Sequence, residues 1–368
     1  MAVNNNRILI APLDWGLGHA TRCVPIIKHL LLQNCTVFIG AEGSSAKLLK
    51  SEFPNITILP LKGYEVKYSK NRFSFLWKII TQLPRILNII HFEKKWVDDA
   101  IKTHDINGVI SDNRLGFYSN KIPSVYITHQ LLIKTGLKLF DTIAQKIHYY
   151  FISKFSVCWV PDFEKNIALA GDLSHPKKLP TIPVNYLGAL SRFKALNLAL
   201  EYKLCIIISG PEPQRSVFEK IVLSQMHQSK EKMVMVRGLP NEENKLNHSF
   251  EHLTNYNHLD AEKLNTVIAQ SEMVLSRSGY STIMDLIILN KNAILVPTPA
   301  QPEQEYLAIH LKNNGLFQFV QQEDLKLGEL INCSKENNQI AQNQTGNCNK
   351  IIDNWLNQLQ VAHPNFQK

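Results

Sequence analysis

A histidine and two glycines follow the first strongly apolar run of the chain. The stretch DWGLGHATR lies between the apolar runs ILIAPL and VPIIKHLLLQ, and this order predicts a strand, a turn and a helix. Gly16 and Gly18 allow a tight turn with close backbone approach because they have no Cβ atom. A helix that begins near His19 or Ala20 would direct N–H groups towards an anion. The residues therefore predict a ligand-binding turn.

His19 has the chemistry of a general base. The helix dipole disfavours a cation at a helix N-terminus, so we expect the imidazole to stay neutral and able to accept a proton. Asp112, at the end of the run VISD, could orient this ring or could cap the segment after it. A hydrogen bond that only holds the turn is the alternative for His19. His129, in YITHQ, could line an acceptor cleft or have a purely structural role.

The same turn also raises a dinucleotide-binding alternative. Glu42, after the second predicted strand, could bind a ribose in a nicotinamide or flavin enzyme. The fingerprint G-x-G-x-x-G requires a third glycine where this chain has Thr21. The match is incomplete, and this alternative ranks below those that follow.

The second half of the chain contains a stretch suited to a nucleotide. SRSGYSTIMD follows the apolar run EMVLS and opens a predicted helix. Ser278, Gly279, Ser281 and Thr282 could supply hydroxyl and backbone donors to phosphates at the helix start, although Ser281 could instead cap the helix. Asp285, about one turn further on, could accept both hydroxyls of a ribose.

This region resembles a known family. RSGYSTIMDLIILNKNAILVPTPAQPEQEYLA is similar to the donor-nucleotide signature of two-domain glycosyltransferases of the GT-B fold. The resemblance is to the family 28 group, which contains the N-acetylglucosaminyltransferase that forms lipid II and diacylglycerol glycosyltransferases. GLGHATR, VYITHQL and YLGALSR match further family motifs in the same order, so the resemblance covers nearly the whole chain.

The resemblance implies roles for three side chains of the donor site. Asp285 would hold the donor ribose, where the family more often has glutamate. Gln304 and Glu305 would contact the sugar hydroxyls, and Glu305 departs from the family's usual pair of amides.

Two further segments are assigned by the resemblance. Arg192, at the end of GALSR, matches an arginine that approaches the diphosphate, a role that suits a permanent guanidinium fork. Ser209 and Gly210 match the loop after the first strand of the second domain. Pro211 and Pro213 replace the glycine-rich continuation of that loop and leave fewer backbone N–H groups there.

The alternation of apolar runs and helical periodicity predicts an α/β fold with two Rossmann-like, doubly wound parallel-sheet domains that face a cleft. A proline-dotted stretch over 175–193 is interpreted as a linker. The predicted boundaries are 1–187 for an acceptor-side domain, 188–200 for the linker, 201–350 for a nucleotide-sugar-binding domain and 351–368 for a helix that packs back. The strands expected in the first domain are 7–13, 36–40, 56–59, 108–111, 124–128 and 157–160.

Charge and composition restrict the partners. The formal net charge of +9 and the pI near 9.1 favour anionic partners, but no nucleic-acid reading module is recognisable, so no nucleic acid is expected. The six scattered cysteines indicate reduced thiols. With neither a secretion signal nor an apolar span of about 20 residues, a cytoplasmic location is expected.

A mixed apolar and basic stretch, 73–96, could contact the inner face of an anionic membrane. Pro84 is expected to kink or divide a helix there. The alternative is a pair of helices that pack in the core.

Together these features predict an enzyme that moves a hexose or N-acetylhexosamine from a nucleotide diphosphate sugar, most simply a UDP-sugar, to an acceptor hydroxyl, with a lipid-linked acceptor as one candidate. No D-x-D motif occurs, so neither a metal site nor a cofactor besides the donor is expected. The alternatives are a nucleotide-sugar hydrolase or epimerase of the same fold and a non-catalytic nucleotide-sugar-binding protein.

Overall fold

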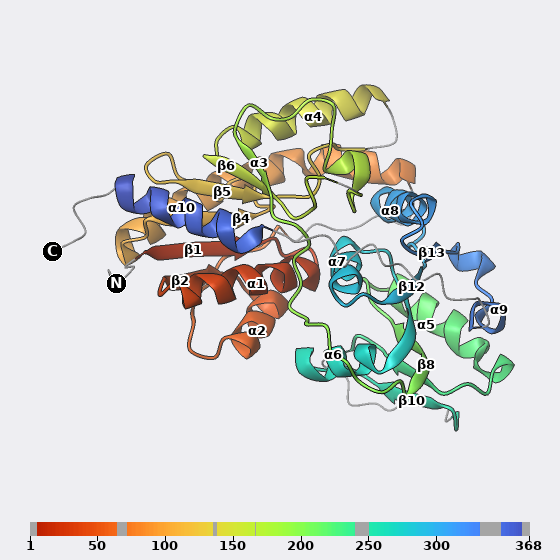
Figure 1. The fold of residues 1–368 in the computed structure, drawn as a ribbon. Helices are drawn as coiled ribbons and strands as arrows, with labels where there is room; N and C mark the ends of the chain where they lie inside the picture. The colour runs from red at the N-terminus through yellow and green to blue at the C-terminus, as the bar shows by residue number, and fades with distance from the viewer. Residues whose placement is uncertain are drawn as a thin grey trace. The chain divides into compact units, whose positions relative to one another are not determined.

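The computed structural model describes residues 6–64, 72–134, 138–165, 167–239, 250–331 and 347–362 (Figure 1). The chain forms two compact units, which are described separately below. Unit 1 comprises Met1–Leu190 and Thr345–Lys368, and unit 2 comprises Ser191–Gln344. The C-terminal helix thus belongs to the same unit as the N-terminal strands.

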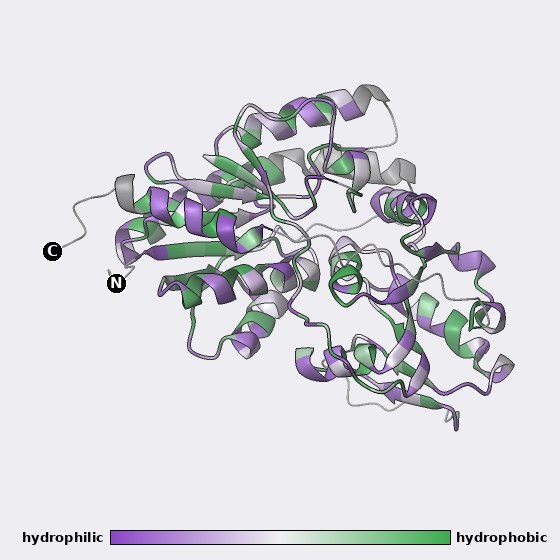
Figure 2. Ribbon diagram, viewed as in Figure 1, coloured by the Kyte–Doolittle hydropathy of each residue, from purple (hydrophilic) through white to green (hydrophobic). Residues whose placement is uncertain are grey.

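Unit 1 is built on a parallel sheet whose described strands have the order β3-β2-β1-β4-β5-β6-β7. Several of its strands are buried along nearly their whole length, as is typical of parallel sheets covered on both faces. The ribbon coloured by hydropathy shows this sheet as largely hydrophobic (Figure 2). The strands are β1 (Arg7–Pro12), β2 (Thr36–Gly40), β3 (Thr57–Leu59), β4 (Gly108–Asp112), β5 (Ser124–Ile127), β6 (Val157–Val160) and β7 (Val184–Tyr186).

The predicted linker over 175–193 is wrong in part, because β7 lies within it. β7 pairs in parallel with β6, with Cys158 opposite Val184. The sequence signal failed because the strand has three residues and follows a run of prolines. The six strands predicted before it are confirmed, with ends that differ by no more than one residue.

The helices of unit 1 connect or cover these strands. α10 packs against α1, and His29 Nε2 lies 2.7 Å from Asp353 Oδ1 between them. The buried face of α10 contains Ile352, Trp355 and Leu359. The helices are α1 (Leu17–Leu32), α2 (Gly43–Glu52), α3 (Arg72–His104), α4 (Lys138–Ile152), α10 (Cys348–Ala362) and a short 3-10 helix η1 (Gly171–Leu173).

α3 corrects the expectation of a divided helix, because one helix runs through the position of Pro84. The side chains of 73–84 lie outside the described residues. Further along α3, Glu93 is buried while Leu87 and Phe92 are 49% and 45% exposed. This part of the helix therefore has both a packed face and an exposed apolar face.

Unit 2 has a second parallel sheet, with the described strands in the order β10-β9-β8-β11-β12-β13. Its core joins apolar side chains from β8, β9 and β11 to helix α5. The strands are β8 (Tyr202–Ile207), β9 (Met233–Val236), β10 (Leu253–Tyr256), β11 (Ser271–Ser276), β12 (Asn292–Leu295) and β13 (Gln318–Phe319). The helices are α5 (Gln214–Ser224), η2 (Met226–Gln228), α6 (Ala261–Ala269), α7 (Tyr280–Ile288), α8 (Pro302–Asn313), η3 (Gln322–Asp324) and α9 (Leu327–Ile331). Two parallel-sheet α/β units confirm the predicted fold class.

Candidate active site

The carboxyl ends of β1, β4 and β5 bring the predicted catalytic residues together in unit 1. Pro12 at the end of β1 is opposite Asp112 at the end of β4, which is in turn opposite Ile127 of β5. The turn that carries His19 and the loop that carries His129 begin just after these strand ends. This edge is where ligands bind in open α/β sheets.

The glycine turn is tighter than the sequence predicts. α1 begins at Leu17, not near His19 or Ala20, and Gly16 stands at its N-cap with a φ of +81°. Because this φ strains any residue with a Cβ atom, glycine is required there. His19 consequently lies in the first turn of α1, where Arg22 three residues later shares its face.

Asp112 holds the two side chains of that face. Its carboxylate is fully buried, and Arg22 is 2% exposed. Arg22 Nε donates to Asp112 Oδ2 at 2.6 Å, and Arg22 Nη2 donates to Asp112 Oδ1. His19 Nδ1 lies 3.1 Å from Asp112 Oδ1. The orienting role that the sequence left open for Asp112 is therefore the one that its contacts support.

The cluster sets the protonation of its members. Burial alone would raise the pKa of Asp112, but the charges of Arg22 and His19 and their hydrogen bonds more than offset it and hold the pKa below its usual range. Burial and the nearby Arg22 charge lower the pKa of His19, although Asp112 opposes this shift. His19 is therefore neutral near pH 7 as expected, with burial and the charge of Arg22 as the main causes. His19 Nδ1 lies 3.1 Å from Asp112 Oδ1 and 2.9 Å from Arg22 Nη2. In the tautomer whose Nδ1 proton is donated to Asp112, Nε2 is the proton acceptor that a general base needs.

His129 belongs to the same cluster. It is 6% exposed, and its Nδ1 lies 3.2 Å from Arg22 Nη1. The structure thus joins both predicted histidines through Arg22, which sequence reasoning missed. The position of Arg22 three residues after His19, on the same face of the predicted helix, was the sequence signal that could have identified it.

A second buried ion pair supports the end of β1. Arg114 Nε donates to Glu93 Oε1 at 2.6 Å, and the two side chains are 1% and 0% exposed. Arg114 Nη1 also donates to the Pro12 carbonyl at 3.2 Å. Gly116 N donates to Glu93 Oε2 at 3.0 Å. This pair, also missed from the sequence, fixes the strand end from which the glycine turn departs.

Glu42 has a different role from the ribose ligand of the dinucleotide alternative. Its backbone caps α2, and its Oε1 accepts a hydrogen bond from Gly63 N at 2.9 Å. The carboxylate is thus engaged in holding a neighbouring loop.

In unit 2, the predicted donor-binding residues gather at the carboxyl ends of β8, β11 and β12. Ser276 at the end of β11 is opposite Ile207 of β8 and Leu295 of β12. Ser209 and Gly210 follow β8, and no atom of the described residues lies within 4 Å of a Cβ built on Gly210. The loop therefore leaves open space at this strand end.

The start of α7 is open in a similar way. Gly279 is the N-cap of α7, and within the part of the chain that the structure describes only Thr282 Oγ1, at 4.0 Å, approaches a Cβ built on it. Ser281 lies inside the helix and does not cap it, so the capping alternative for Ser281 is wrong. Ser281 and Thr282 are half-buried beside a helix start that has no side-chain cap. The first N–H groups of α7 remain suited to an anion.

Three other predicted donor-site residues hold the loop between β12 and α8. Ser278 Oγ donates to the Gln304 carbonyl at 2.9 Å. Gln304 Oε1 accepts from Thr298 N at 2.9 Å, and Glu305 Oε1 accepts from Ala300 N at 3.2 Å. The polar atoms of these three residues are thus hydrogen-bonded within the protein, where they hold the shape of the loop.

Asp285 accepts a hydrogen bond from Ser191 Oγ within unit 2. Burial raises the pKa of Asp285 to about 7, although this hydrogen bond and the charge of Arg192 oppose the rise. The Arg192 guanidinium stacks over the Phe193 ring at 5.2 Å. Arg192 and Asp285 thus lie near each other, as the donor-site prediction requires.

Arg277 is a further residue that sequence reasoning missed. It is 2% exposed and lies over the Phe218 ring at 4.1 Å. Its guanidinium donates to the carbonyls of Pro297 and Gln214 at 3.1 and 3.2 Å, and to Gln322 Oε1 at 2.6 Å. Burial lowers its pKa to about 10, so it remains a cation. It ties together the loops that follow β11 and β12 and the start of α5.

Among the described residues, no group of three or more His, Cys, Asp or Glu side chains could hold a metal ion. The expectation of a reaction without metal or cofactor stays a prediction.

Comparison with known proteins agrees with this division of the chain. A model of the glycosyltransferase family 28 C-terminal domain matches residues 206–354. The chain is 24% identical over 330 residues to the UDP-N-acetylglucosamine--N-acetylmuramyl-(pentapeptide) pyrophosphoryl-undecaprenol N-acetylglucosamine transferase of Buchnera aphidicola subsp. Schizaphis graminum, over 87% of this chain and 86% of that relative. An enzyme of the same name from Sulfurihydrogenibium sp. is 27% identical over 130 residues, 33% of this chain and 35% of that relative.

Solved structures show the same fold at low identity. Acinetobacter baumannii MurG matches with a TM-score of 0.56 and 14% identity, over 96% of this chain and 99% of that chain. The calicheamicin glycosyltransferase CalG4 matches with a TM-score of 0.64 and 11% identity, over 99% and 100% of the two chains. The chain is therefore a nucleotide-sugar-dependent glycosyltransferase of the GT-B fold, and its residues 206–354 are similar to the glycosyltransferase family 28 C-terminal domain.

Proposed function

We propose that this glycosyltransferase moves an N-acetylhexosamine or hexose from a UDP-sugar to a hydroxyl of a lipid-linked acceptor. The observation that carries the proposal is the His19 ring held by Asp112 at the carboxyl edge of the first sheet. The names of the two relatives, which specify a UDP-N-acetylglucosamine donor and a pyrophosphoryl-undecaprenol acceptor, support this donor and acceptor class.

His19 acts as the general base in this proposal. Its Nε2 takes the proton of the acceptor hydroxyl while the hydroxyl oxygen forms a bond to the anomeric carbon of the sugar. The bond from that carbon to the diphosphate breaks, and its electrons stay on the departing diphosphate oxygen. Asp112 stabilises the imidazolium that forms, and Arg22 keeps Asp112 ionised.

The residues of unit 2 hold the donor and stabilise the leaving diphosphate. The N-terminus of α7 at Gly279 offers N–H groups, and Arg192 adds a permanent positive charge. Asp285 binds the ribose, and the loop held by Gln304 and Glu305 surrounds the sugar. This arrangement supplies charge stabilisation without a metal ion or a further cofactor.

A steady-state assay tests the proposal. Purified enzyme with UDP-N-acetylglucosamine should release UDP rapidly only when a polyprenyl-pyrophosphoryl-sugar acceptor is present, and the acceptor should gain one sugar by mass spectrometry. UDP release at the same rate without acceptor would instead identify a hydrolase. Conversion of the donor to an isomer would identify an epimerase.

We further infer that α3 and α4 contact an anionic membrane where such an acceptor resides. α4 exposes Ile143, Ile147 and Tyr150 by 49%, 48% and 59%, a spacing that places them on one face of the helix. Lys146 is exposed beside them, and Lys154 Nζ lies 4.3 Å from the centroid of the Tyr150 ring. An apolar stripe with adjacent lysines suits the interface of an anionic bilayer.

Such contact would be peripheral. No helix of the described residues has the length and apolar character needed to cross a bilayer.

Vesicle sedimentation tests this contact. The protein should bind vesicles that contain phosphatidylglycerol, and I143Q together with I147Q should reduce the bound fraction several-fold. T142Q is the matched control, because Thr142 is exposed on the same helix but contributes no comparable apolar surface. Equal binding of the double variant and the control would contradict the proposed contact.

A further inference from the structure

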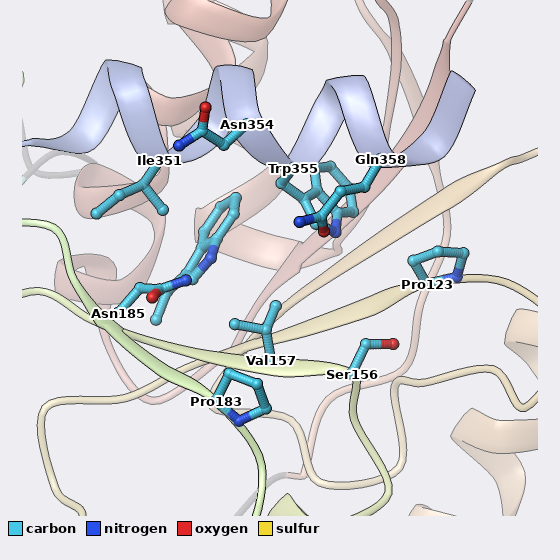
Figure 3. A pocket seen from close by; sticks show the side chains of 10 residues that line it. Pro123, Ser156, Val157, Pro183, Asn185, Ile351, Asn354, Trp355 and Gln358 are labelled. Carbon is cyan, nitrogen blue, oxygen red and sulfur yellow. The ribbon is translucent and has the colours of Figure 1, made fainter. Parts of the chain in front are cut away.

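Trp15 is an exposed aromatic residue in the turn that leads to His19. Among the tryptophans whose side chains the structure describes, it alone is exposed, with 41% of its surface accessible. Trp355, by contrast, is 3% exposed and packs from α10 beside a cavity of about 290 Å³ (Figure 3). Pro123 and Ser156, which also line that cavity, precede β5 and β6, so it is at the amino edge of the sheet. Single exposed apolar residues are ordinary on protein surfaces, but Trp15 stands at the carboxyl edge with the catalytic cluster.

Two contacts with one residue hold Trp15 near the catalytic imidazole. Leu13, two residues before Trp15, donates its N–H to the Asp112 carbonyl at 2.9 Å. His19, four residues after Trp15, has its Nδ1 atom 3.1 Å from Asp112 Oδ1. The segment 13–19 is thus a short loop held at both ends by Asp112. Trp15 and the imidazole therefore share one strand end.

The backbone of the loop presents the Trp15 side chain. Gly16 N donates to the Asp14 carbonyl at 3.0 Å, which makes a γ-turn with Trp15 at its centre. The side chain of the central residue points away from the ring that this hydrogen bond closes. The indole is therefore displayed at the carboxyl edge of the sheet, and its exposure agrees with this geometry.

The base of the turn is anchored in the core of unit 1. Asp14 Oδ1 accepts a hydrogen bond from Tyr64 N at 3.0 Å. A Cβ atom at Gly63 would collide with the Asp14 carboxylate, so glycine permits this close approach. Tyr64 is 5% exposed, and its hydroxyl donates to Oε2 of the buried Glu93 at 2.7 Å. The backbone beneath Trp15 is therefore fixed before an acceptor arrives, which reduces the entropic cost of binding.

A sugar ring is the acceptor group that suits such a surface. The faces of a pyranose present C–H groups and are partly apolar, whereas its hydroxyls point outward from its edge. An indole face can cover those C–H groups, and tryptophan loses little conformational freedom because it has only two χ angles. A hydroxyl at the edge of the stacked sugar remains free to approach Nε2 of His19.

We propose that the indole face of Trp15 binds the sugar ring of the acceptor and thereby places the reacting hydroxyl at His19. The inference rests on the proposed glycosyl transfer and names the group of the acceptor that unit 1 recognises. Trp15 belongs to unit 1, whereas Asp285 and the other donor-site residues belong to unit 2. Affinity for the acceptor should therefore depend on Trp15, and affinity for the donor should not.

Steady-state rates with a short-chain acceptor test the proposal. The acceptor is the one active in the transfer assay above, with its lipid shortened to geranyl and used without vesicles, so that the sugar is kept and the bilayer is removed. W15A should raise KM for this acceptor about tenfold and leave KM for the UDP-sugar unchanged. W15L, which keeps an apolar side chain but no flat face, should raise it several-fold. W15Y, which restores an aromatic face, should stay within about twofold of the original protein.

L32A is the matched control, and thermal melting shows whether each variant is folded. Leu32 is 77% exposed at the last residue of α1, and its truncation should change neither KM. Absence of transfer by the original protein would overturn the proposed function and this inference with it. Transfer with the same acceptor KM in W15A and L32A would overturn this inference alone. An equal rise in KM for the donor, a fall in kcat at constant KM, or an effect confined to long-chain acceptor in vesicles, as expected of a membrane anchor, would also overturn it.

Discussion

The catalytic cluster of unit 1 and the donor-binding region of unit 2 are organised by different forces. In unit 1, buried charges hold one another, and Arg22 and His19 both contact Asp112. In unit 2, several predicted site residues bond to loop backbone, as Ser278 does with the Gln304 carbonyl. The arrangement in unit 1 sets the protonation of His19 and Asp112, and the arrangement in unit 2 sets the shape of the donor-site loop. Substitutions should therefore change chemistry and pH dependence in unit 1, and donor affinity in unit 2.

D112N should have the largest effect. It leaves the Arg22 cation buried without its carboxylate partner, which should lower the free energy of unfolding by about 3 kcal/mol. It should also lower kcat about 10³-fold, because the His19 ring loses the charge that orients it. Denaturant unfolding and initial rates measure both changes.

D353N provides the matched control, since Asp353 also pairs with a histidine of α1 but at its other end. Similar kcat values for D112N and D353N would show that the cluster has no catalytic role.

H19A should have the next largest effect. It should lower turnover about 10²- to 10⁴-fold and leave UDP binding, measured by calorimetry, unchanged. Because the pKa of His19 is lowered from 6.5, the original enzyme should keep its activity somewhat below pH 6.5. Its rate should then fall as the pH drops through the pKa of the folded state. The variant should lack this acid limb. H29A, which breaks the remote pair on the same helix, should retain both the rate and the limb, and a fully active H19A would exclude the base assignment.

D285N should alter the pH dependence of stability. A carboxyl whose folded pKa is raised to about 7 binds its proton more tightly in the folded than in the unfolded state. Its contribution is therefore present below the unfolded pKa, near 3.8, and is lost as the pH rises through 7. The variant should melt at a higher temperature than the original protein above pH 7, and this advantage should shrink as the pH falls towards 4. Parallel melting curves across this range would mean that the carboxyl is not perturbed.

S278A should have the smallest effect. Loss of the hydrogen bond to the Gln304 carbonyl should cost about 1 kcal/mol of stability and raise KM for the donor a few-fold with little change in kcat. S281A should raise KM without the loss of stability, if its hydroxyl contacts a phosphate. A drop in kcat with constant KM for either variant would contradict a donor-binding role.

The sequence predicts best what depends on local pattern. The strands follow from their runs of continuous apolar residues. The pairing of His19 with Asp112 follows from strand ends that meet at one edge of a parallel sheet. Arg22 was missed because burial of an arginine depends on a carboxylate ninety residues away. The start of α1 was misplaced because its position depends on the left-handed backbone of Gly16. Ser281 and β7 show the same limitation, since caps and short edge strands are decided by neighbours distant in sequence.

The return of α10 to unit 1 has a consequence for synthesis. Gly108 at the start of β4 and Trp159 of β6 contact the Trp355 ring of α10, which the ribosome adds only after the whole of unit 2. The first unit to emerge therefore cannot complete its packing until unit 2, which lies between its two parts in the sequence, has been synthesised. Shortening the chain before α10 should leave an aggregation-prone sheet and a folded second unit, even though every residue of the catalytic cluster has been made.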